Sequence, residues 1–423
     1  MINNKLVPKR RFKEFKNDEA WEQRKFDLLF EPISSNTLSR ADLNYENGKI
    51  KSVHYGDILI KYGSVIDCDK DIIPFITGAE ASDYQSQILQ DGDVLIADAA
   101  EDETVGKVAE IEGISEIPIV SGLHTIACRP RVKMQPNYLG YYMNSQLFHK
   151  QLLPLMQGIK VLSVSRTNLS KTTICYPTLA EEQSHIVKFF SNLDHLITLH
   201  QRKLKKLKDL KSAYLSEMFP KEGEKYPKLR FAGFTAPWEQ RTLGEVANIT
   251  GGGTPSTSIP GYWDGDIDWY SPVEIGDQIY VSVSQKKITE LGLEKSSARM
   301  LPVGTILFTS RAGIGNTAIL AKEGCTNQGF QSIVPHKDEL DSYFIFSRTH
   351  ELKHYGETIG AGSTFVEVSG KQMAKMSILL PSKEEQRKIG SFYEQLDNLI
   401  TLHQHKLKKL EDIKKAYLNE MFV

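Results

Sequence analysis

The sequence predicts an α+β fold in which two β-rich domains are separated by a long antiparallel two-helix coiled coil. Three observations predict this fold. A long helical segment occurs twice, short β-branched and aromatic runs fill the stretch before each copy, and only a short linker follows the first copy. The predicted parts are a first globular domain over 1–176, a first spacer helix over 177–220, a second globular domain over 221–380 and a second spacer helix over 381–423.

The repeated segment is long and nearly identical in its two copies. Residues 192–219 read NLDHLITLHQRKLKKLKDLKSAYLSEMF, and residues 395–422 read QLDNLITLHQHKLKKLEDIKKAYLNEMF. From Glu182 and Glu385 onward, 25 of 39 aligned positions are identical at a constant offset of 203 residues. Weaker repeats, such as WEQR at 21–24 and 238–241, extend the match into the globular parts. The whole chain is therefore predicted to be an internal duplication.

The globular parts are dominated by short runs typical of strands, such as GDILIKYGSVI, PIVSGLHTIACRP and GTILFTS. Helical stretches are fewer, and we expect them at about 136–153 and 338–355. Each globular part is therefore predicted to be an α+β domain with a β-rich core.

In both repeated segments, apolar residues recur at alternating spacings of four and three, which is the pattern of paired helices. His200 and His403 lie in the same stripe, either at its polar edge or as a buried pair that fixes register. The lysine-rich opposite face is either a solvated surface or a contact for phosphates or partner proteins. The predicted helix-pairing seam consists of Leu193, Ile197, Leu204, Leu207, Tyr214, Met218, Leu396, Ile400, Leu407, Leu410, Tyr417 and Met421.

The linker predicts the direction of the second helix. The first helix, from about residue 181 to 218, should be roughly 55 Å long at 1.5 Å per residue. Only PKEGEKYP separates its end from the second globular domain. That domain is therefore expected at the far end of the first helix, and the second helix runs back from it. The result is an antiparallel pair with a pseudo-two-fold axis.

Composition excludes several classes of protein. The chain has 423 residues, of which 40% are hydrophobic and 25% charged, and its net charge is −1. A uniformly basic nucleic-acid-binding protein is excluded, although local basic faces are not. No apolar run approaches the roughly 18 residues that a membrane span needs. Four widely separated cysteines without CxxC spacing argue against a zinc site or a disulfide framework, and they predict a cytoplasmic protein.

Sequence motifs for catalysis are absent. None of the GK pairs belongs to a phosphate-binding loop, GGGTPS at 251–256 does not form GxGxxG, and neither HExxH nor GxSxG occurs. The acidic loop ADAAEDETVG at 97–106 is interpreted as a solvated or partner-facing loop rather than a metal site, since its spacing does not recur in the second half. We therefore expect a recognition protein with no catalytic and no metal-binding residue.

Four motifs and their order carry a resemblance to a known family. They are PKLRFAGFTAPWEQRTLGEVANITGGGTPS, YWDGDIDWYSPVEI, GTILFTSRAGIGNTAIL and the junction LPSKEEQRKIGSFYEQLDNLITLHQHKLKKL with its first-half copy. In this order they resemble the DNA specificity subunits of type I restriction–modification systems, the HsdS family. The resemblance covers essentially the full chain. It implies that each globular part is a target recognition domain that reads one half of a bipartite DNA site.

The resemblance also implies partners and cofactors. The helices would set the spacing of the two domains and dock two methyltransferase subunits of the HsdM type, and two restriction subunits of the HsdR type would join the larger complex. S-adenosylmethionine would bind the methyltransferase partner, ATP and Mg the restriction partner, and no cofactor this chain. The expected partners are double-stranded DNA and these subunits, with no membrane. The complex would methylate adenine and cleave foreign DNA.

Candidate DNA-binding residues lie on polar loops, because base reading needs polar side chains that reach the groove edges. In the first domain they are Lys61, Tyr62, Ser64, Lys107, His124, Lys160, Ser163, Ser165 and Arg166. In the second domain they are Thr254, Ser256, Ser310, Arg311, Asn316, Gln328, Gln331, Ser363 and Thr364. Gly313 and Gly315 would let the backbone approach DNA closely. Trp263, Trp269 and Tyr270 are interpreted as core aromatics, with groove contacts as the alternative.

Two points stay open at this level. The acidic loop at 97–106 stands where the second domain has TSRAGIGN, and carboxylates accept from cytosine N4 but repel phosphate, so the assignment of the first-domain loops is open. Two other classes of function are a stand-alone nuclease or methyltransferase with unusual motifs, and a coiled-coil scaffold with two protein-binding domains. Activity without partners would favour the former, and a complex that protects no bipartite DNA site would favour the latter.

Overall fold

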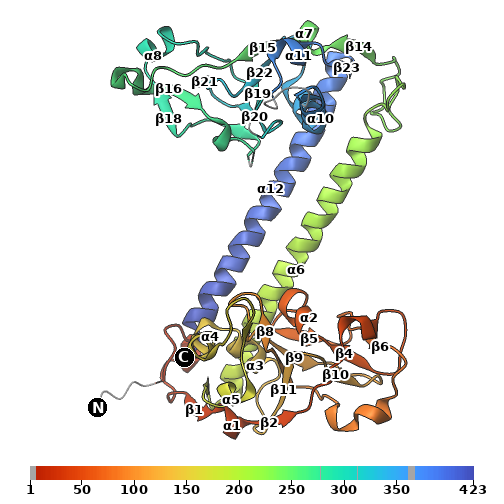
Figure 1. Ribbon diagram of the computed structural model, residues 1–423, viewed down its shortest axis with the longest axis vertical. Helices are drawn as coiled ribbons and strands as arrows, with labels where there is room; N and C mark the ends of the chain where they lie inside the picture. The colour runs from red at the N-terminus through yellow and green to blue at the C-terminus, as the bar shows by residue number, and fades with distance from the viewer. Residues whose placement is uncertain (1–5, 277, 312, 361–366) are drawn as a thin grey trace. The chain divides into compact units, whose positions relative to one another are not determined.

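The computed structural model describes residues 6–276, 278–311, 313–360 and 367–423. The chain divides into two compact units, the first formed by residues up to 201 together with 405–423, and the second by residues 202–404. Each unit holds one globular domain and a part of both long helices, α6 (Ala180–Glu217) and α12 (Lys383–Glu420) (Figure 1). The predicted boundaries treat each helix as a segment of its own, whereas the structure divides each helix between the two units.

The core of the first domain is a five-stranded sheet with the order β2-β11-β7-β9-β5. Neighbouring strands are antiparallel except β9 and β5, which are parallel. The central strands β7 and β9 are buried along almost their full length; β7 consists of Val, Leu, Ile and Ala, whereas β9 also carries Glu110 and Glu112. The strands are β2 (Phe30–Ile33), β5 (Val65–Asp67), β7 (Val94–Ala97), β9 (Val108–Glu112) and β11 (Thr125–Pro130).

The core of the second domain repeats this sheet with the order β15-β22-β19-β20-β17. Here too the neighbours are antiparallel except the last pair, β20 and β17, which are parallel. The predicted duplication therefore extends to the order and direction of every strand in the main sheet. The strands are β15 (Ala247–Gly251), β17 (Tyr280–Val281), β19 (Ile306–Phe308), β20 (Thr317–Leu320) and β22 (Gln331–Pro335).

Smaller sheets and short helices surround each main sheet. In the first domain the strands are β1 (Glu22–Lys25), β3 (Leu43–Asn44), β4 (Lys51–Val53), β6 (Phe75–Ile76), β8 (Ala99–Ala100), β10 (Ile119–Ser121), β12 (Leu162–Ser163) and β13 (Thr173–Tyr176). Its helices are α1 (Phe26–Leu29), α2 (Tyr55–Ile60), α3 (Tyr138–Met143), α4 (Gln146–Leu152) and α5 (Arg166–Leu169).

The second domain has a similar set. Its strands are β14 (Glu239–Thr242), β16 (Trp263–Tyr270), β18 (Lys286–Ile288), β21 (Cys325–Thr326) and β23 (Ser377–Leu380). Its helices are α7 (Leu243–Val246), α8 (Glu290–Glu294), α9 (Ser342–Ser347), α10 (Thr349–Gly360) and α11 (Gly370–Ala374). The helical stretches expected at about 136–153 and 338–355 are confirmed as α3 with α4, and α9 with the first part of α10.

In the first unit α6 and α12 pack in opposite directions. The Phe189 and Tyr417 rings meet edge to face with centroids 4.9 Å apart. Further along α6, the Asp194 carboxylate lies 2.6 Å from Lys414 Nζ, which precedes Tyr417 on α12. The Tyr141 hydroxyl of α3 donates to the same carboxylate at 3.0 Å. The domain and both helices are therefore joined at Asp194.

The second unit repeats this arrangement with the helices exchanged. The Asp397 carboxylate of α12 lies 2.5 Å from Lys211 Nζ and accepts from the Tyr343 hydroxyl at 3.0 Å. Tyr214 then meets Phe392 with ring centroids 5.1 Å apart, so the two helices run antiparallel here as well. The predicted antiparallel pair is confirmed in both units. All twelve predicted seam residues are buried or half-buried.

A buried ion pair ties the start of each long helix to its own domain. Glu182 accepts both Nε and Nη2 of Arg11 at 2.7 Å, together with the Trp21 indole N–H at 3.2 Å. Glu385 accepts Arg230 through the same two atoms, again at 2.7 Å. Both glutamate side chains are 1% exposed. These contacts explain the EEQ motif, because its second glutamate is the buried partner of an arginine near the start of the domain.

The repeated Met-Phe pair at the end of each helix enters a hydrophobic core. Phe422 packs against Tyr138, Tyr142 and Phe190 in the first unit. Its repeat counterpart, Phe219, belongs to the core of the second unit. Each long helix is thus anchored by burial at both of its ends. None of the helices in the described ranges is long and apolar enough to cross a membrane.

Candidate nucleic-acid interface

Three loops of the first domain meet at the edge of the main sheet where β7 ends and β11 begins. The Asp98 N–H donates to the His124 carbonyl at 3.0 Å, and the Val164 N–H donates to the Asp98 carbonyl at 2.9 Å. Strands β8 and β12 pair antiparallel beside these bonds. We call residues 98–100, 122–125 and 157–164 the first loop cluster. These main-chain hydrogen bonds, which we call the main-chain frame, hold the three loops together.

The second domain has a matching cluster of loops. The Ser310 N–H donates to the Gly329 carbonyl at 2.8 Å, and the Val368 N–H donates to the Ser310 carbonyl at 3.0 Å. Arg311 and Glu367 form an antiparallel bridge in the place of β8 and β12. We call residues 310–311, 327–330 and 367–369 the second loop cluster. Its main-chain hydrogen bonds correspond one by one to those of the first cluster.

Side chains in the second loop cluster form a linked polar network. Arg311 Nη2 donates to the Gln328 carbonyl at 2.6 Å, and its Nε lies 3.8 Å from Glu367 Oε1. The Thr254 hydroxyl donates to Gln328 Oε1. The structure therefore brings together three residues that the sequence proposed for DNA binding from three different loops.

The other candidates of the second domain are dispersed. Ser310 is fully buried and donates to the Gly329 carbonyl at 3.1 Å, so its hydroxyl supports the loop from inside. Ser256 is exposed and pairs with Ser258 at 2.8 Å, whereas Gln331 is half-buried. Asn316 is exposed and lines a groove that includes Asp397 and Thr401 of α12. Ser363 and Thr364 lie outside the described residues.

In the first domain, Lys61, Tyr62, Ser64 and Lys107 gather at the end of α2. Tyr62 donates to the Ile72 carbonyl at 3.0 Å, and Lys61 bonds the same carbonyl. Lys107 Nζ donates to the Leu59 and Tyr62 carbonyls, each at 3.0 Å. Burial lowers the pKa of Lys107, and nearby Lys414 adds to the shift. Ser64 is buried. This group closes the end of α2 and borders a groove along the long helices.

The remaining candidates of the first domain divide between structural contacts and exposed loop positions. Ser165 caps α5 by accepting from the Asn168 N–H at 3.1 Å. Arg166 Nη2 donates to the Ile33 carbonyl at 2.9 Å. Lys160 and Ser163 are exposed within the first loop cluster. His124 lies in the same cluster and pairs with Asp98, a residue that the sequence did not single out.

The aromatic residues near the glycine-rich loop behave as core. Trp269 is 6% exposed and Tyr270 is 1% exposed, which confirms the interpretation of both as core aromatics. The Trp269 indole N–H donates to the Gly253 carbonyl at 2.8 Å. Trp263 packs edge to face on Trp269 at 5.2 Å. These contacts hold the Gly251–Gly253 stretch against the small sheet formed by β16, β18 and β21.

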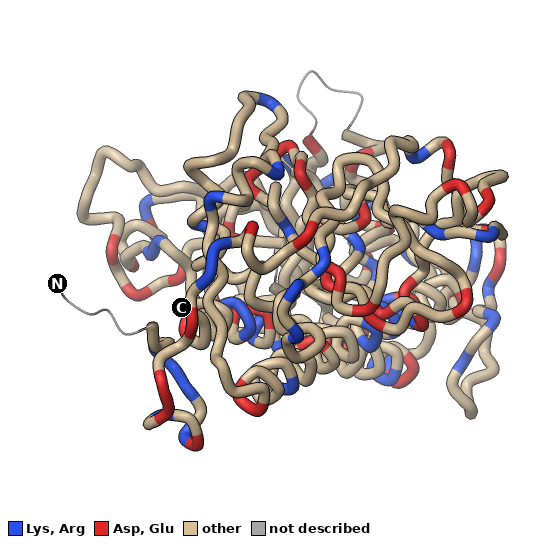
Figure 2. The backbone as a smooth tube through the Cα atoms, turned by 90° about the horizontal axis from the view of Figure 1, so that it is seen from below, with Lys and Arg blue, Asp and Glu red and all other residues tan. Residues whose placement is uncertain are grey.

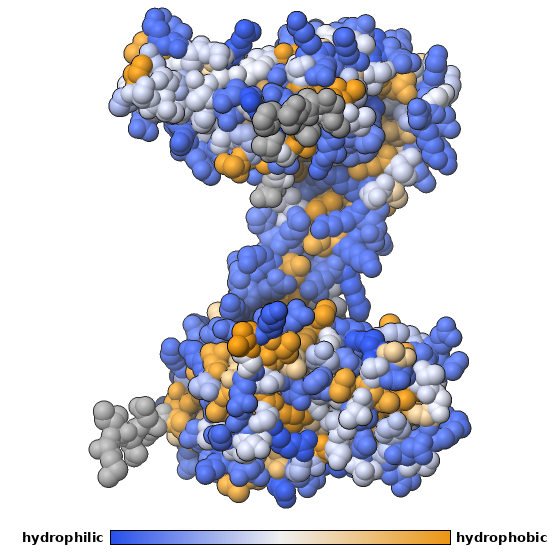
Figure 3. All heavy atoms as spheres, in the orientation of Figure 1, coloured by the Kyte–Doolittle hydropathy of each residue, from blue (hydrophilic) through white to orange (hydrophobic). Residues whose placement is uncertain are grey.

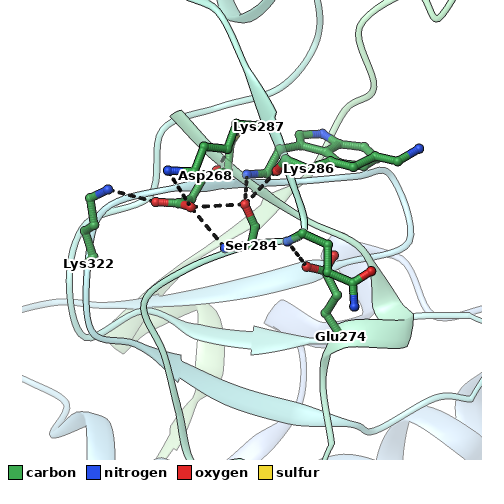
Figure 4. Close-up of polar contacts among 9 residues, drawn as sticks. Asp268, Glu274, Ser284, Lys286, Lys287 and Lys322 are labelled. Atoms are coloured by element: carbon green, nitrogen blue, oxygen red, sulfur yellow. Dashed lines mark hydrogen bonds and ion pairs between the residues drawn. The ribbon is translucent and has the colours of Figure 1, made fainter. Parts of the chain in front are cut away.

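A buried carboxylate organises this small sheet. Asp268 has a fully buried side chain that lies 2.8 Å from Lys322 Nζ and 3.6 Å from Lys287 Nζ (Figure 4). Its Oδ1 also accepts from the Ser284 N–H and hydroxyl at 3.0 and 3.1 Å. Burial raises the pKa of Asp268, but the hydrogen bonds from Lys322 and Ser284 outweigh it and hold that pKa below the usual range. Asp268 is therefore an ionised carboxylate, and its contacts stabilise the sheet.

Charge and ligand chemistry also limit what the site can do. Within the described ranges, no group of three or more His, Cys, Asp or Glu side chains is placed to hold a metal ion. Acidic and basic residues are interspersed along the backbone, as Figure 2 shows, in keeping with the net charge of −1. The polar loop clusters are thus suited to hydrogen bonding more than to long-range attraction of phosphates.

A family model described as the type I restriction modification DNA specificity domain matches residues 18–209 and 236–412. The chain belongs to this family. The two matched regions correspond to the two halves of the duplication, so each half is one specificity domain with its helix. The predicted membership in the HsdS family is confirmed.

Curated relatives of this family are similar over part or all of the chain. The MjaIX type I restriction enzyme specificity subunit of Methanocaldococcus jannaschii is 40% identical over 190 residues, covering 44% of this chain and 43% of the relative. The putative MjaX specificity subunit of the same organism is 25% identical, covering 95% of this chain and 92% of the relative. The EcoR124I/EcoR124II specificity subunit of Escherichia coli is 28% identical over 38% of this chain and 41% of the relative.

Solved structures support the fold. The S subunit of a type I restriction–modification system from M. genitalium matches with a TM-score of 0.66 at 16% identity, covering 99% of both chains. A chain from a study of complex assembly and conformational transition of the type I system matches with a TM-score of 0.50 at 18% identity, covering 95% of this chain and 97% of that chain. The predicted arrangement of β-rich domains and long paired helices is therefore shared with solved members of the family.

Proposed function

We propose that this chain is the DNA-recognition subunit of a type I restriction–modification complex, in which each globular domain reads one half of a bipartite site. The observation that best supports this proposal is that the two loop clusters share one main-chain frame but present different polar groups. The first cluster has Asp98 and His124, and the second has Arg311 and Gln328. Different donors and acceptors on one frame are what two readers of different base sequences require.

The long helices supply the spacing and the docking sites in this proposal. Leu196 and Leu199 of α6 are 41% and 39% exposed, and their repeat counterparts Leu399 and Leu402 of α12 are each 46% exposed. The space-filling view shows a mostly hydrophilic helix surface with apolar residues in narrow bands (Figure 3). Identical leucines exposed in both copies would suit two identical partners. We propose that those partners are two methyltransferase subunits, joined in the larger complex by two restriction subunits.

Catalysis would then reside entirely in the partners. S-adenosylmethionine would bind the methyltransferase subunits, and ATP and Mg the restriction subunits. This chain would contribute recognition, since its sequence carries no catalytic motif for either reaction. The compartment we propose is the cytoplasm, a reducing environment that fits four free buried cysteines.

The proposal is tested by exchanging domains. The first domain, residues 1–176, is replaced by that of another family member, and the chain is assembled with its methyltransferase partner. Sequencing of methylated DNA should show one half-site changed and the other retained. The reciprocal exchange of residues 221–380 should change only the second half-site. A change in both half-sites after a single exchange would contradict independent reading by the two domains.

The scaffold alternative is separated by footprinting the assembled complex on DNA. Our proposal expects protection of two short half-sites with an unprotected or weakly protected spacer. A complex that assembles fully and protects no bipartite site would favour a protein-binding scaffold instead.

A further inference from the structure

Asp98 and His124 are two titratable residues of the first loop cluster whose side chains share a hydrogen bond. Among the described residues of this cluster, they are the only such pair. His124 Nδ1 lies 3.0 Å from Asp98 Oδ1. The His124 side chain is 50% exposed, whereas that of Asp98 is 28% exposed. The carboxylate is therefore the inner member of the pair, and the imidazole is the outer one.

The position of the imidazole is fixed from three sides. The His124 backbone has a φ of +52°, a left-handed conformation that is strained for a non-glycine residue. The Tyr55 ring packs edge to face on the imidazole with centroids 5.3 Å apart. The His124 carbonyl accepts from the Asp98 N–H at 3.0 Å. Main chain, aromatic ring and carboxylate thus hold one side-chain orientation.

The carboxylate also determines which ring nitrogen carries the proton. An ionised carboxylate only accepts hydrogen bonds, so Nδ1 must donate and the neutral ring must leave Nε2 as an acceptor. Within the described part of the chain, Nε2 has no hydrogen-bond partner. Burial raises the pKa of Asp98, and the bond from His124 opposes this shift. The pair therefore presents Nε2 of its more exposed member, His124, as an acceptor from a fixed position.

Among the described residues of the second domain, no Asp–His pair stands at the equivalent place. Ser310 occupies the place of Asp98 in the main-chain frame, and its hydroxyl is turned inward to the Gly329 carbonyl at 3.1 Å. The polar side chains described there include half-buried Arg311, which is a donor only, and exposed Gln328. The first cluster therefore presents a hydrogen-bond acceptor from His124, whereas the second presents the donors of Arg311.

We propose that His124 is a specificity-determining residue of the first domain, whose Nε2 accepts from an exocyclic amino group of a base, and that Asp98 is the positioning residue that fixes its tautomer. This inference rests on the proposed function, because it assigns one base contact to the first half-site. In the major groove, adenine N6 and cytosine N4 carry such amino groups, whereas guanine O6 and thymine O4 are acceptors. The contact would discriminate one base pair from its alternatives.

The first test replaces His124 by alanine in the complex with methyltransferase subunits. The probe is a library of DNA duplexes randomised over the first half-site and methylated by the assembled complex. One base pair of the first half-site should lose on the order of tenfold discrimination, while the other positions and the second half-site keep theirs. His124→Asn is the second variant, since Asn tolerates a left-handed backbone and secures the result if alanine perturbs the loop.

The second test separates positioning from direct contact. Asp98→Asn supplies a side chain that can donate as well as accept, so the tautomer of His124 is no longer fixed. The same base pair should lose several-fold discrimination, and the preference should spread to pairs that present an acceptor. Adding Asp98→Asn to His124→Ala should change nothing further, because Asp98 acts through the imidazole. A further change in the double variant would show that Asp98 contacts the base itself and would overturn its assigned role.

A charge-matched control is Glu101→Gln, which removes one negative charge from an exposed position in the neighbouring loop. It should leave the base preference at every position unchanged. Retained bipartite methylation with an unaltered first half-site in both His124 variants would overturn this inference and leave the proposed function intact. Wild-type complex that shows no bipartite preference would instead refute the proposed function.

Discussion

The two globular domains show how far a duplicated fold can diverge without losing its frame. Their main sheets have the same strand order and the same single parallel pair. Their loop clusters share main-chain hydrogen bonds but differ in the side chains that they present. Between the two halves, the backbone contacts and the ends of the long helices are therefore retained, whereas the polar groups beyond the sheet edge differ.

The start of the helix after the main sheet gives a second contrast. In the first domain, Glu110 of β9 accepts from the Asn137 and Gly140 N–H groups at 2.6 and 2.9 Å, at the beginning of α3. In the second domain, Ile319 stands at the corresponding strand position, and α9 is capped by its own Asp341, which accepts from the Phe344 N–H at 2.9 Å. The same requirement, an acceptor at a helix N-terminus, is met from two different places in the chain.

The largest expected effect comes from breaking the buried helix anchors that the two halves share. Glu182→Ala should destabilise the first unit by about 3–5 kcal/mol, because it leaves buried Arg11 without its carboxylate. Glu385→Ala should do the same in the second unit through Arg230. Hydrogen–deuterium exchange followed by mass spectrometry would assign each loss to its own unit. Equal loss of protection in both units after either substitution would contradict separate anchoring.

The neighbouring glutamate of the same motif offers a matched control. Glu181 is exposed and begins α6 in the same turn as Glu182. Glu181→Ala should change the free energy of unfolding by no more than about 0.5 kcal/mol, as expected of a surface substitution.

The next effect concerns pH and should be confined to the first unit. Burial raises the pKa of Glu110 to about 7. Because this folded-state pKa lies above the unfolded value, the folded state binds the extra proton between about pH 4.5 and 7, and the free energy of unfolding falls as pH rises through that window. The contribution lost is about 3 kcal/mol. Glu110→Gln should flatten this pH dependence, measured by urea unfolding at pH 5 and pH 8.

The second unit is the internal comparison for this pH effect. It has Ile319 in place of the buried carboxyl, so amide protection in its main sheet should not change with Glu110→Gln. An unchanged pH dependence in the first unit of the variant would show that Glu110 does not titrate in this range.

The smallest effect tests the cap of α9. Asp341→Ala removes the side chain that accepts from the Phe344 N–H and should cost about 1 kcal/mol in the second unit. Asp341→Asn should retain nearly full stability, since asparagine caps helices about as well as aspartate. Thermal unfolding of the two variants measures the difference, and equal destabilisation by both would point to the charge of Asp341 rather than its hydrogen bond.

The sequence predicted the long helices closely, whereas its loop candidates lie in different structural settings. The helices were expected from about residue 181 to 218 and are observed at Ala180–Glu217, with the copy at Lys383–Glu420. Among the loop candidates, Thr254, Arg311 and Gln328 are linked in one polar network, whereas Lys107 and Ser165 are engaged in closing short helices. A loop residue that caps a helix and one that faces solvent have the same local sequence pattern, so sequence alone does not separate them.

Asp98 and the Tyr141–Asp194–Lys414 contact were not identified from the sequence for the same reason. Each joins residues from separate segments, and no local periodicity marks them. The sequence nevertheless contained a signal for the Asp194–Lys414 contact, because these two residues recur as Asp397 and Lys211 at the repeat offset. An acid and a base that recur on opposite helices of a predicted antiparallel pair are candidates for contact.

The duplication, the two long helices, their antiparallel pairing and the β-rich character of the domains all follow from the amino-acid sequence. These features depend on local periodicity, on the repeat and on the length of one linker, all of which can be read along the chain. In contrast, the three-dimensional fold was needed to identify which loops form each cluster, which arginine neutralises each buried glutamate and which carboxylate orients His124. Those contacts join residues far apart in sequence, and they exist because strand pairing brings the ends of distant strands to one edge of a sheet.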